Sequence, residues 1–555
     1  NRLIFMTGPF TGTPVQASSN FEVISFNPLT GCNISVGNSH GFWGARLKFA
    51  GFDGVVVQGA SKKPVYLWIH DGECEIRDAS NIWGKADAFD TEDIIKKELG
   101  REKISVAAIG PAGENLCAAA MVQNERGHVA AKGNTGIVMG SKRLKAIAVS
   151  GTGKVPVADP SKFSELAIKW REESIGPIMN TIHTSGTATG LERNHNTGSL
   201  PVKNLTTSVF PEYKTLTGQY IRKTFELKRD PCYGCSINHC NTVTVTEGPY
   251  KGFVGEEPEY EALANLGSNI GISDPGTVTW LSDYVDRLGI DGNWAGAMVG
   301  WAMEAYERGI LTKEALGGLE LRWGDEKAAA ELLRRTAHRQ GIGDILALGL
   351  KKAAEKIGGA KAVAFAVHFK GESNHAYDSR AAGGGQMLHL AIAGAGPRWE
   401  GPGVRLDFDL AGELTQIKLM PALKLFQETL GVCMFGYLDV KMDTITEAYQ
   451  ALTGLPMSAE TALVTADRID NLQRAFNVRH GFKPEMDLDV SPRFLEAPVD
   501  GPNKGKAMGA KWVGLVKEYN RLKEWDWETG RPSRGKLEQL ELAGVADDLW
   551  GKAGG

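Results

Sequence analysis

The segment Asp230–Cys240 is the part of the chain whose residue types most clearly allow metal chemistry. It places thiols at Cys232, Cys235 and Cys240. A C-x2-C turn lets two thiolates bind one soft metal centre, and a third cysteine nearby supplies another ligand. A fourth ligand has to come from elsewhere, and Cys433, which follows a predicted helix, is the leading candidate. The spacing predicts a metal centre and leaves an iron–sulfur cluster and a structural zinc site equally open.

Other interpretations of these cysteines stay open at this point. A zinc site could use His239 in place of the distant cysteine. A redox pair would need only Cys232 and Cys235, but it should lie at a strand-to-helix turn of a βαβ unit, a pattern that the sequence lacks here. Cys433 could also be a small buried apolar residue. Packing is the better interpretation for the remaining cysteines, Cys32, Cys74 and Cys117.

The composition limits the class of protein. The chain has 555 residues, 42% hydrophobic and 23% charged, as in an ordinary globular protein, and this length suggests about three domains. The net charge of −4 argues against nucleic acid as a general partner. Seven cysteines is a low, odd number that fits a reducing compartment, so we expect a cytoplasmic protein. No apolar run suits a membrane span, and no signal-peptide pattern opens the chain.

The first part of the chain, to about residue 155, favours strands. Asn1 is not an initiator Met and Arg2–Met6 already has the pattern of a strand, so we expect the natural chain to begin earlier. One helix is predicted near Thr91–Leu99. Short apolar runs predict further strands at Phe21–Phe26, Gly54–Gly59, Val65–His70, Ile104–Ile109 and Lys145–Ser150. We therefore predict a β-rich domain over residues 1–155.

Helical patterns dominate after this point. Asp159-Pro160 and Asp274-Pro275 each combine a helix N-cap with a proline at the first helical position. Longer helices are predicted at Asn293–Arg308, Glu326–Arg339, Asp344–Ile357, Leu410 to about Leu430, and Ser458–Phe476. The sequence thus predicts an α+β protein, in which the β-rich domain is followed by two mostly α-helical domains over residues 156–365 and 366–555. The cysteine segment falls in the first of these and Cys433 in the second.

Further motifs occur in a fixed order along the chain. They are Gly8–Thr13, Asn27–Gly31, Leu47–Asp53, Ile82–Gly84, Ile109–Asn115, Val138–Val149, Glu257–Glu261, Asp286–Asp291, Ala376–Arg380 and Gly501–Gly505. In this order they resemble the large catalytic subunit of the tungsten-dependent aldehyde ferredoxin oxidoreductase family. The resemblance covers nearly the whole chain, although the first segment of the family's N-terminal domain has no match.

The resemblance implies a tungsten (or molybdenum) atom held by two pyranopterin dithiolenes, buried between the three domains beside a [4Fe–4S] cluster. The cluster ligands that it implies are Cys232, Cys235, Cys240 and Cys433. The family's two pterin-binding repeats match Asp286–Asp291 and Glu428–Cys433. Asp286 and Glu428 would then accept hydrogen bonds from pterin N–H groups, whereas spacing alone would make both of them solvated residues at helix ends.

A Mg²⁺ ion between the pterin phosphates is also implied, near Asn38 and Gly133. Glycine lets the backbone approach a phosphate, and carbonyl oxygens suit a hard cation, but such a turn taken alone would most often be only a turn. The cofactor-binding residues carried over from the family are Asn38, Ser39, His40, Lys132, Gly133, Thr135, Asp286, Ile290, Asp291, Glu428, Val432 and Met434.

Glu261 matches the family's active-site glutamate, and Tyr260 precedes it in the same motif. A carboxylate in an apolar pocket has a raised pKa and can exchange protons near neutral pH, so Glu261 would activate a water or metal-bound oxygen for attack on an aldehyde carbon. Without the resemblance, a glutamate beside Pro258 would be an exposed residue at a helix start. His389 is the histidine predicted to assist Glu261, and His375 is the alternative.

The chain departs from the family's pattern in several places. The third cluster cysteine follows after four residues, where the family usually has three. Asn20 takes the position of an arginine that links pterin and cluster. The family's pocket histidine and a nearby lysine fall at Arg398 and Glu400, and an arginine in the pocket would favour an anionic substrate. Trp280 replaces the glutamate of a Glu/His pair that binds a lone iron between subunits.

The leading prediction is an enzyme that oxidises aldehydes to carboxylic acids and passes electrons to ferredoxin or a small iron–sulfur partner subunit, in a homo- or hetero-oligomer. The runner-up is a low-potential reductase of a carboxylate or aromatic thioester on the same scaffold. A third prediction, from a different class, is a zinc-stapled binding or scaffold subunit without a pterin.

Overall fold

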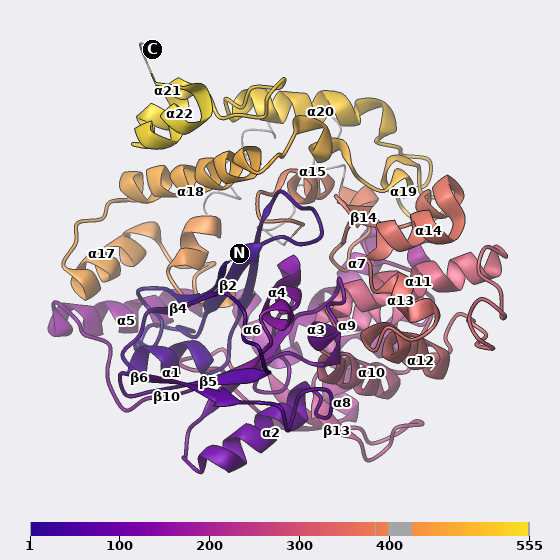
Figure 1. Cartoon of the computed structure of the whole chain (residues 1–555), viewed down its shortest axis with the longest axis horizontal. Coiled ribbons are helices and arrows are strands. Elements are labelled where there is room, and N and C mark those ends of the chain that lie inside the picture. Colours follow the sequence, from indigo (N-terminus) through magenta and orange to yellow (C-terminus); the bar gives the residue numbers. More distant parts are fainter. Residues whose placement is uncertain (1, 383–384, 398–423, 553–555) are drawn as a thin grey trace.

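The computed structural model describes residues 2–382, 385–397 and 424–552. Figure 1 shows the N-terminal strands at the lower left, helices from α10 (Pro275–Leu288) to α14 (Leu350–Val363) at the right, and α18 (Ala459–Arg479) and α20 (Gly509–Leu522) along the top. Within the described residues, no helix combines the length and apolar character needed to cross a membrane.

An antiparallel four-stranded sheet opens the β-rich domain, with the order β3-β2-β1-β4. Its strands are β1 (Arg2–Thr7), β2 (Phe21–Phe26), β3 (Ile34–Ser39) and β4 (Gly54–Gln58). Buried and half-buried residues alternate along β2, as expected of a strand with one face on a core. Trp43, at the start of α1 (Trp43–Phe49), packs on that face against Phe5 and Phe21.

The second sheet has six strands in the order β6-β5-β10-β7-β8-β9. These are β5 (Val65–His70), β6 (Glu73–Asp78), β7 (Ser105–Ala108), β8 (Val122–Asn124), β9 (His128–Ala130) and β10 (Leu144–Ser150). Every residue of β10 is buried, because apolar clusters cover both faces of the sheet at this strand. A short 3-10 turn, Lys132–Asn134, leads from β9 into α4 (Thr135–Ser141).

Both predicted aspartate caps are present. Asp159 accepts a hydrogen bond from the Lys162 N–H at the start of α5 (Pro160–Ser174), and Asp274 accepts one from Thr277 at the start of α10. The helix α11 (Gly292–Glu307) is buried along most of its length in the largest apolar cluster, which also takes in α12 (Glu326–Ala337) and α14. The predicted α+β class, with a β-rich domain followed by helical regions, is confirmed.

Helix α5 packs against α17 (Met442–Thr453), far along the chain. Phe163 and Trp170 of α5 share an apolar cluster with Ile445 of α17.

The predicted helix from Leu410 to about Leu430 lies mostly outside the described residues. The other helices and short strands are α2 (Ala88–Leu99), α3 (Pro111–Glu114), α6 (Pro177–Ser185), α7 (Leu191–Thr197), α8 (Gly218–Thr224), α9 (Tyr260–Asn265), α13 (Ile342–Leu346), α15 (Gly385–Ile392), α19 (Pro492–Leu495), α21 (Arg534–Gln539), α22 (Ala543–Trp550), β14 (His368–Phe369) and β15 (Glu372–Ser373). The predicted domain boundaries stay predictions.

A small three-stranded sheet holds the cysteine segment. It contains β11 (Glu226–Arg229), β12 (Asn241–Thr244) and β13 (Val254–Glu256), and the segment Asp230–Cys240 connects β11 to β12. The helical patterns of residues 156–365 predict no such sheet. All four residues of β11 are exposed, so the alternation that marks a strand is missing.

Candidate cofactor cavity and active site

A cavity of about 1240 Å³ collects residues from all three predicted regions of the chain. The β-rich domain contributes Asn38, His40 and Lys132, the middle region contributes Glu261 and Asp286, and the C-terminal region contributes Glu428, Val432 and Met434. Cys232, Cys235, Cys240 and Cys433 also line it. The structure therefore brings all four predicted cluster cysteines to the same cavity as the two predicted pterin-binding carboxylates.

Ala17 joins the cysteine segment to Cys433. Its N–H donates a hydrogen bond to the carbonyl of Gly234 at 2.8 Å, and its own carbonyl accepts one from the Cys433 N–H at 2.9 Å. Ala17 has a φ of 56°, which a residue with a side chain rarely adopts. The turn itself is closed by the Cys235 N–H, which donates to the Cys232 carbonyl at 3.2 Å. The N-terminal domain thus holds the two cysteine-bearing segments in place.

The thiols affect one another electrostatically. A hydrogen bond from the Cys240 thiol holds the pKa of Cys232 well below its ordinary value, with burial opposing and the nearby His128 reinforcing this shift. The same hydrogen bond and burial raise the pKa of Cys240. Burial, together with Cys235 and Cys232, raises the pKa of Cys433. Four soft sulfur ligands at one wall suit an iron–sulfur cluster or a zinc ion.

The zinc alternative also has a geometric basis. Ligand atoms of His239, Cys240 and Glu259 lie within 4.8 Å of one another. His239 is next to Cys240 in the chain, and its Nδ1 is 3.7 Å from the Cys240 Sγ. Geometry alone therefore leaves the choice between cluster and zinc open.

The two predicted pterin repeats adopt matching arrangements. Gly289 and Gly431 both have left-handed backbones, with φ of 70° and 79°. A Cβ on Gly289 would lie 2.6 Å from the Gly110 nitrogen, and a Cβ on Gly431 would lie 2.9 Å from the Gly8 nitrogen. Gly110 and Gly8 each precede a proline in the β-rich domain. Each repeat is thus docked on this domain by a glycine pair that leaves no room for a side chain.

This docking places one carboxylate of each repeat at the cavity. Asp286 is half-buried, and burial together with Glu256 and Asp283 raises its pKa well above the ordinary value. Glu428 is 6% exposed and forms an ion pair with Lys424. Neither carboxylate is fully exposed, so both remain candidates for binding polar hydrogens of a ligand.

The residues predicted near the phosphates and Mg²⁺ cluster around the 3-10 turn. Lys132 Nζ lies 3.1 Å from Asp291 Oδ2 and donates to Ser373 Oγ at 3.0 Å. Gly133 has a φ of 86°, and a Cβ there would lie 2.9 Å from the Ser35 Cβ. The hydroxyls of Thr135 and Ser35 are buried without a hydrogen-bond partner.

Of the other predicted cofactor-binding residues, some line the cavity and some do not. Ser39 donates a hydrogen bond to Asn124 Oδ1 at 3.1 Å, whereas His40 lines the cavity with its Nδ1 buried and unpartnered. Ile290 is fully buried and pairs through its backbone with Ala120, away from the cavity wall. Asp291 lines the cavity, pairs with Lys132 and caps α11 by accepting a hydrogen bond from the Asn293 N–H.

Glu261 lies in the first turn of α9 at the cavity wall. Its Oε2 accepts a hydrogen bond from the Ala376 N–H at 2.8 Å, and its Oε1 lies 3.8 Å from His375 Nδ1. Burial raises the pKa of Glu261, but His375, the Ala376 N–H and Lys132 outweigh it, so the net pKa is lowered. The expectation of a raised pKa is therefore wrong, because the carboxylate faces cationic and N–H groups. Glu261 is ionised at neutral pH.

Tyr260 also contacts the segment that bears His375. It is 4% exposed, its hydroxyl donates to the Ala376 carbonyl at 2.8 Å, and its ring lies 5.0 Å from that of Tyr377. Burial raises the pKa of Tyr260 well above its ordinary value, so it stays protonated. Tyr260 and Glu261 together hold the backbone at Ala376, and thereby the position of His375.

His375 rather than His389 is the histidine beside Glu261. His389 is buried in α15 and is not among the described residues that line the cavity. Arg398 and Glu400 lie outside the described residues. Asn20 is buried and donates to Glu22 at 3.2 Å, and the ring of Trp280 stacks on those of Tyr250 and Tyr284.

His128 is a further residue of the site. Its Nε2 lies 3.7 Å from the Cys232 Sγ. The half-buried Glu256 is close by, and its pKa is raised to about 8 by desolvation, with His128 opposing the shift. No motif marked His128 in the sequence, because its contact with the cysteine depends on how β9 meets the β11–β12 connection.

Comparison with known proteins identifies the family. The model of the aldehyde ferredoxin oxidoreductase N-terminal domain matches residues 1–151, and that of domains 2 and 3 matches residues 166–542. The tungsten-containing aldehyde ferredoxin oxidoreductase of Pyrococcus furiosus is 35% identical over 567 residues, covering 98% of this chain and 90% of the relative. The corresponding protein of Thermococcus kodakarensis matches to the same extent, 35% over 567 residues. The chain belongs to the tungsten-containing aldehyde ferredoxin oxidoreductase family.

Members with other names share this scaffold. The chain is 34% identical over 581 residues to the aliphatic sulfonate oxidoreductase, WOR-like subunit, of Pyrococcus furiosus, covering 98% of this chain and 88% of that one. Among solved structures, the active-site complex BamBC of benzoyl coenzyme A reductase with 1,5-dienoyl-CoA matches with a TM-score of 0.81 and 24% identity, covering 99% of this chain and 90% of the matched chain. This likeness shows the fold. The predictions of the family and of an oxidoreductase are confirmed.

Membership of this family implies a tungsten pterin cofactor. The residues present fit such a group. The cavity has the size of a large ligand site. Lys132 and Lys424 supply cationic groups suited to phosphates, and the unpartnered His40 Nδ1 offers a hydrogen-bonding atom at the wall.

Proposed function

We propose that the protein oxidises aldehydes to carboxylic acids with a tungsten (or molybdenum) bis-pyranopterin, and that electrons leave through a [4Fe–4S] cluster to ferredoxin or an iron–sulfur partner subunit. The observation that carries this proposal is the shared cavity. Four cysteine thiols, two carboxylates on matching repeats and the ionised Glu261 all face the same space.

The overall reaction consumes one water. An aldehyde and a water give a carboxylic acid, two protons and two electrons. When bound, the tungsten pterin supplies an acceptor for the electron pair, and the cluster supplies a one-electron route out of the cavity. The protein's own residues must therefore bind the aldehyde, orient the water and remove protons.

Glu261 is suited to take the first proton. Because its carboxylate is ionised, it can accept a proton from the water that adds to the aldehyde carbon. The hydrogen bond from the Ala376 N–H fixes one carboxylate oxygen, and the oxygen nearer His375 stays available at the wall. His375 is then the next group that can take the proton, and Tyr260 keeps the segment that bears it in place.

The remaining assignments follow the family's motifs. Asp286 and Glu428 would accept hydrogen bonds from the two pterins, and Asn38, Gly133 and Lys132 would lie near the phosphates and their Mg²⁺. Support comes from the matching glycine-docked repeats and from the crowded, left-handed turn at Gly133. A cytoplasmic location and a homo- or hetero-oligomer belong to the same proposal.

A second candidate is a low-potential reductase on the same scaffold. It is favoured by the relative named for aliphatic sulfonates and by Arg398, which replaces the family's pocket histidine and suits an anionic substrate. The zinc-stapled scaffold loses support, because the chain belongs to a family of tungsten enzymes.

Metal analysis and a substrate screen test these alternatives together. The protein isolated without oxygen should contain tungsten (or molybdenum) and about four irons per chain. Reduction of a ferredoxin with aliphatic or aromatic aldehydes supports aldehyde oxidation. Activity only in the reducing direction, with a carboxylate or thioester, supports the second candidate. Zinc alone would overturn both.

A further inference from the structure

A small void adjoins the main cavity at His375 and Tyr377, which line both spaces. Its volume is about 10 Å³, which is room for one water molecule. His375 therefore borders both the void and the main cavity. Asn204 and Asn374 also line the void, and all three residues are nearly fully buried, at 9%, 1% and 4% exposure for His375, Asn204 and Asn374.

Each of these residues leaves a polar atom without a partner in the protein. Asn204 uses its Nδ2 to donate to Glu304 Oε2 at 2.6 Å and to the Phe365 carbonyl at 3.0 Å, but its Oδ1 accepts nothing. Asn374 uses its Nδ2 to donate to the Tyr377 carbonyl at 2.6 Å, and its Oδ1 is likewise unpartnered. Buried polar atoms left in this way are costly unless water satisfies them.

His375 also places unpartnered polar atoms near the void. Both ring nitrogens of His375 are buried without a hydrogen-bond partner. Nδ1 is the nitrogen near Glu261, at 3.8 Å from Oε1. Nε2, at the other side of the ring, is therefore the nitrogen available to the void. Two acceptor oxygens and one ring nitrogen around a void of this size match the partners that a buried water needs.

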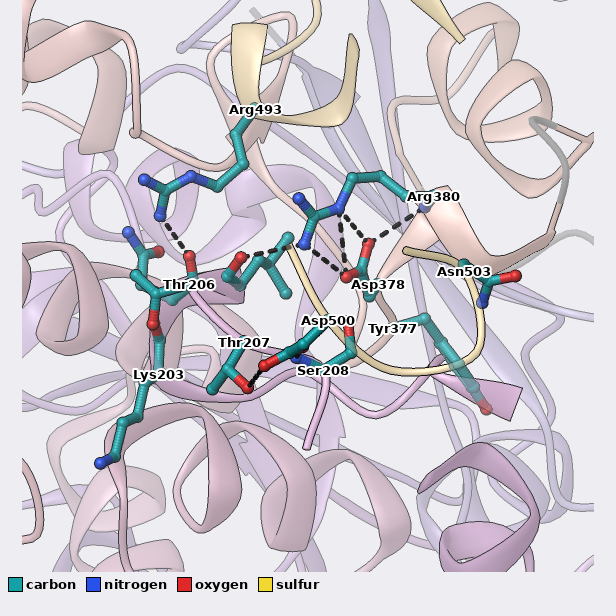
Figure 2. A network of polar contacts seen from close by, with 12 residues as sticks. Lys203, Thr206, Thr207, Ser208, Tyr377, Asp378, Arg380, Arg493, Asp500 and Asn503 are labelled. Atoms are coloured by element: carbon teal, nitrogen blue, oxygen red, sulfur yellow. Dashed lines mark hydrogen bonds and ion pairs between the residues drawn. The ribbon is translucent and has the colours of Figure 1, made fainter. Parts of the chain in front are cut away.

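The wall that carries Asn204 is held in a costly conformation. Lys203, Asn204 and Leu205 have successive φ values of 42°, 53° and 63°, a left-handed turn made without glycine. Arg493 donates to the Asn204 carbonyl at 2.5 Å, and Arg380 donates to the Leu205 carbonyl at 2.9 Å, as Figure 2 shows. Such backbone strain persists only where surrounding structure enforces it, and it is concentrated at functional sites.

Both arginines are themselves anchored by buried carboxylates. Arg493 forms an ion pair with Glu304 at 2.6 Å, and Arg380 pairs with Asp378 at 2.7 Å. Glu304 also accepts from the Asn204 side chain, so the same carboxylate fixes the turn and the orientation of the amide. These contacts occupy the Nδ2 and the carbonyl of Asn204 and leave its Oδ1 without a partner in the protein.

We propose that this void binds one structural water, which accepts a hydrogen bond from His375 Nε2–H and donates to Asn204 Oδ1 and Asn374 Oδ1. With its two hydrogens used by amide oxygens, the water can only accept from the ring. The water thereby holds the ring with Nε2–H pointing into the void and leaves Nδ1 as the nitrogen that exchanges a proton with Glu261. His375 is thus a positioning residue that acts on the substrate only through Glu261. This role rests on the proposed function, whereas the water site itself does not.

A high-resolution crystal structure of the purified enzyme tests the site. We expect one water within about 2.7–3.2 Å of Asn204 Oδ1, Asn374 Oδ1 and His375 Nε2. A void without water, or a ring turned so that Nε2 meets another group, overturns the proposal. This result does not depend on which substrate is oxidised, so it can fail or hold apart from the proposed function.

Two substitutions at apolar lining residues test the consequence. In Ala297→Val the larger side chain should fill the void and expel the water. In Val367→Ala the void becomes larger and should still hold the water. Neither substitution changes a polar group. We expect Ala297→Val to lower kcat about tenfold with KM unchanged, the lower end of the losses found when groups that orient a metal-bound histidine are removed. Val367→Ala should keep the water and the wild-type pH profile. Equal losses in both variants, or full activity in an Ala297→Val enzyme whose structure shows that the water is gone, would contradict the positioning role.

Discussion

Replacing Gly431 by alanine tests how the β-rich domain holds the C-terminal repeat. A Cβ at this position would collide with Thr11 Oγ1 and lie 2.9 Å from the Gly8 Cα, on a backbone with φ of 79°. Thr11 Oγ1 now accepts from the Gly8 N–H at 3.0 Å and donates to the Asn20 carbonyl at 2.9 Å. The left-handed backbone costs about 1–2 kcal/mol with a side chain, and two weakened hydrogen bonds add about 1 kcal/mol each. We expect a loss of about 3 kcal/mol in unfolding free energy.

The assay is denaturant unfolding of Gly431→Ala, combined with iron analysis. Cys433 follows two residues later, so displacement of the repeat should also lower the iron content. Gly514→Ala is the matched control, because Gly514 is exposed in α20 and a Cβ there meets nothing within 4 Å. Alanine should stabilise that helix by about 0.5–1 kcal/mol. Wild-type stability and full iron in Gly431→Ala would refute the close docking of the repeat on Gly8.

Three further predictions concern single side chains. Glu261→Gln keeps the shape of the residue but removes the base, so turnover should fall about a hundredfold or more at full metal content, and near-normal activity would show another proton route. Cys433→Ala should lose electron transfer and iron more than folding, and retention of four irons would exclude it as a ligand. Burial raises the pKa of Glu372 to about 7 from its ordinary 4.5. The folded state therefore binds more protons, stability falls as pH rises through this range, and Glu372→Gln should gain up to about 3 kcal/mol at pH 8 but nothing at pH 4. Unfolding curves at both pH values check this, and an equal gain at both would contradict it.

Local signals in the sequence predicted local structure well. Asp159 and Asp274 cap helices where the Asp-Pro pairs placed them, because a cap depends only on neighbouring residues. The helix predicted from Ser458 begins at that cap in the structure. The family motifs predicted that the four cysteines and the carboxylates of both repeats belong to one site. All six residues line the cavity.

Contacts between distant segments could not be predicted in the same way. The hydrogen bonds of Ala17 to Gly234 and Cys433 depend on the left-handed backbone of this alanine, which neither composition nor spacing predicts. The pairing of Glu261 with His375 and the Ala376 N–H reversed the expected pKa shift, because the partners come from a segment far along the chain. The contact of His128 with Cys232 likewise arises only when separate strands meet.

Anomalous diffraction from crystals grown without oxygen tests the central claim most directly, since data at the iron, tungsten and zinc edges locate each element. We expect iron peaks within bonding distance of the Sγ atoms of Cys232, Cys235, Cys240 and Cys433, and a tungsten (or molybdenum) peak in the cavity between Asp286 and Glu428. A zinc peak at the cysteines, or a cavity without a heavy metal between the two carboxylates, would contradict the account.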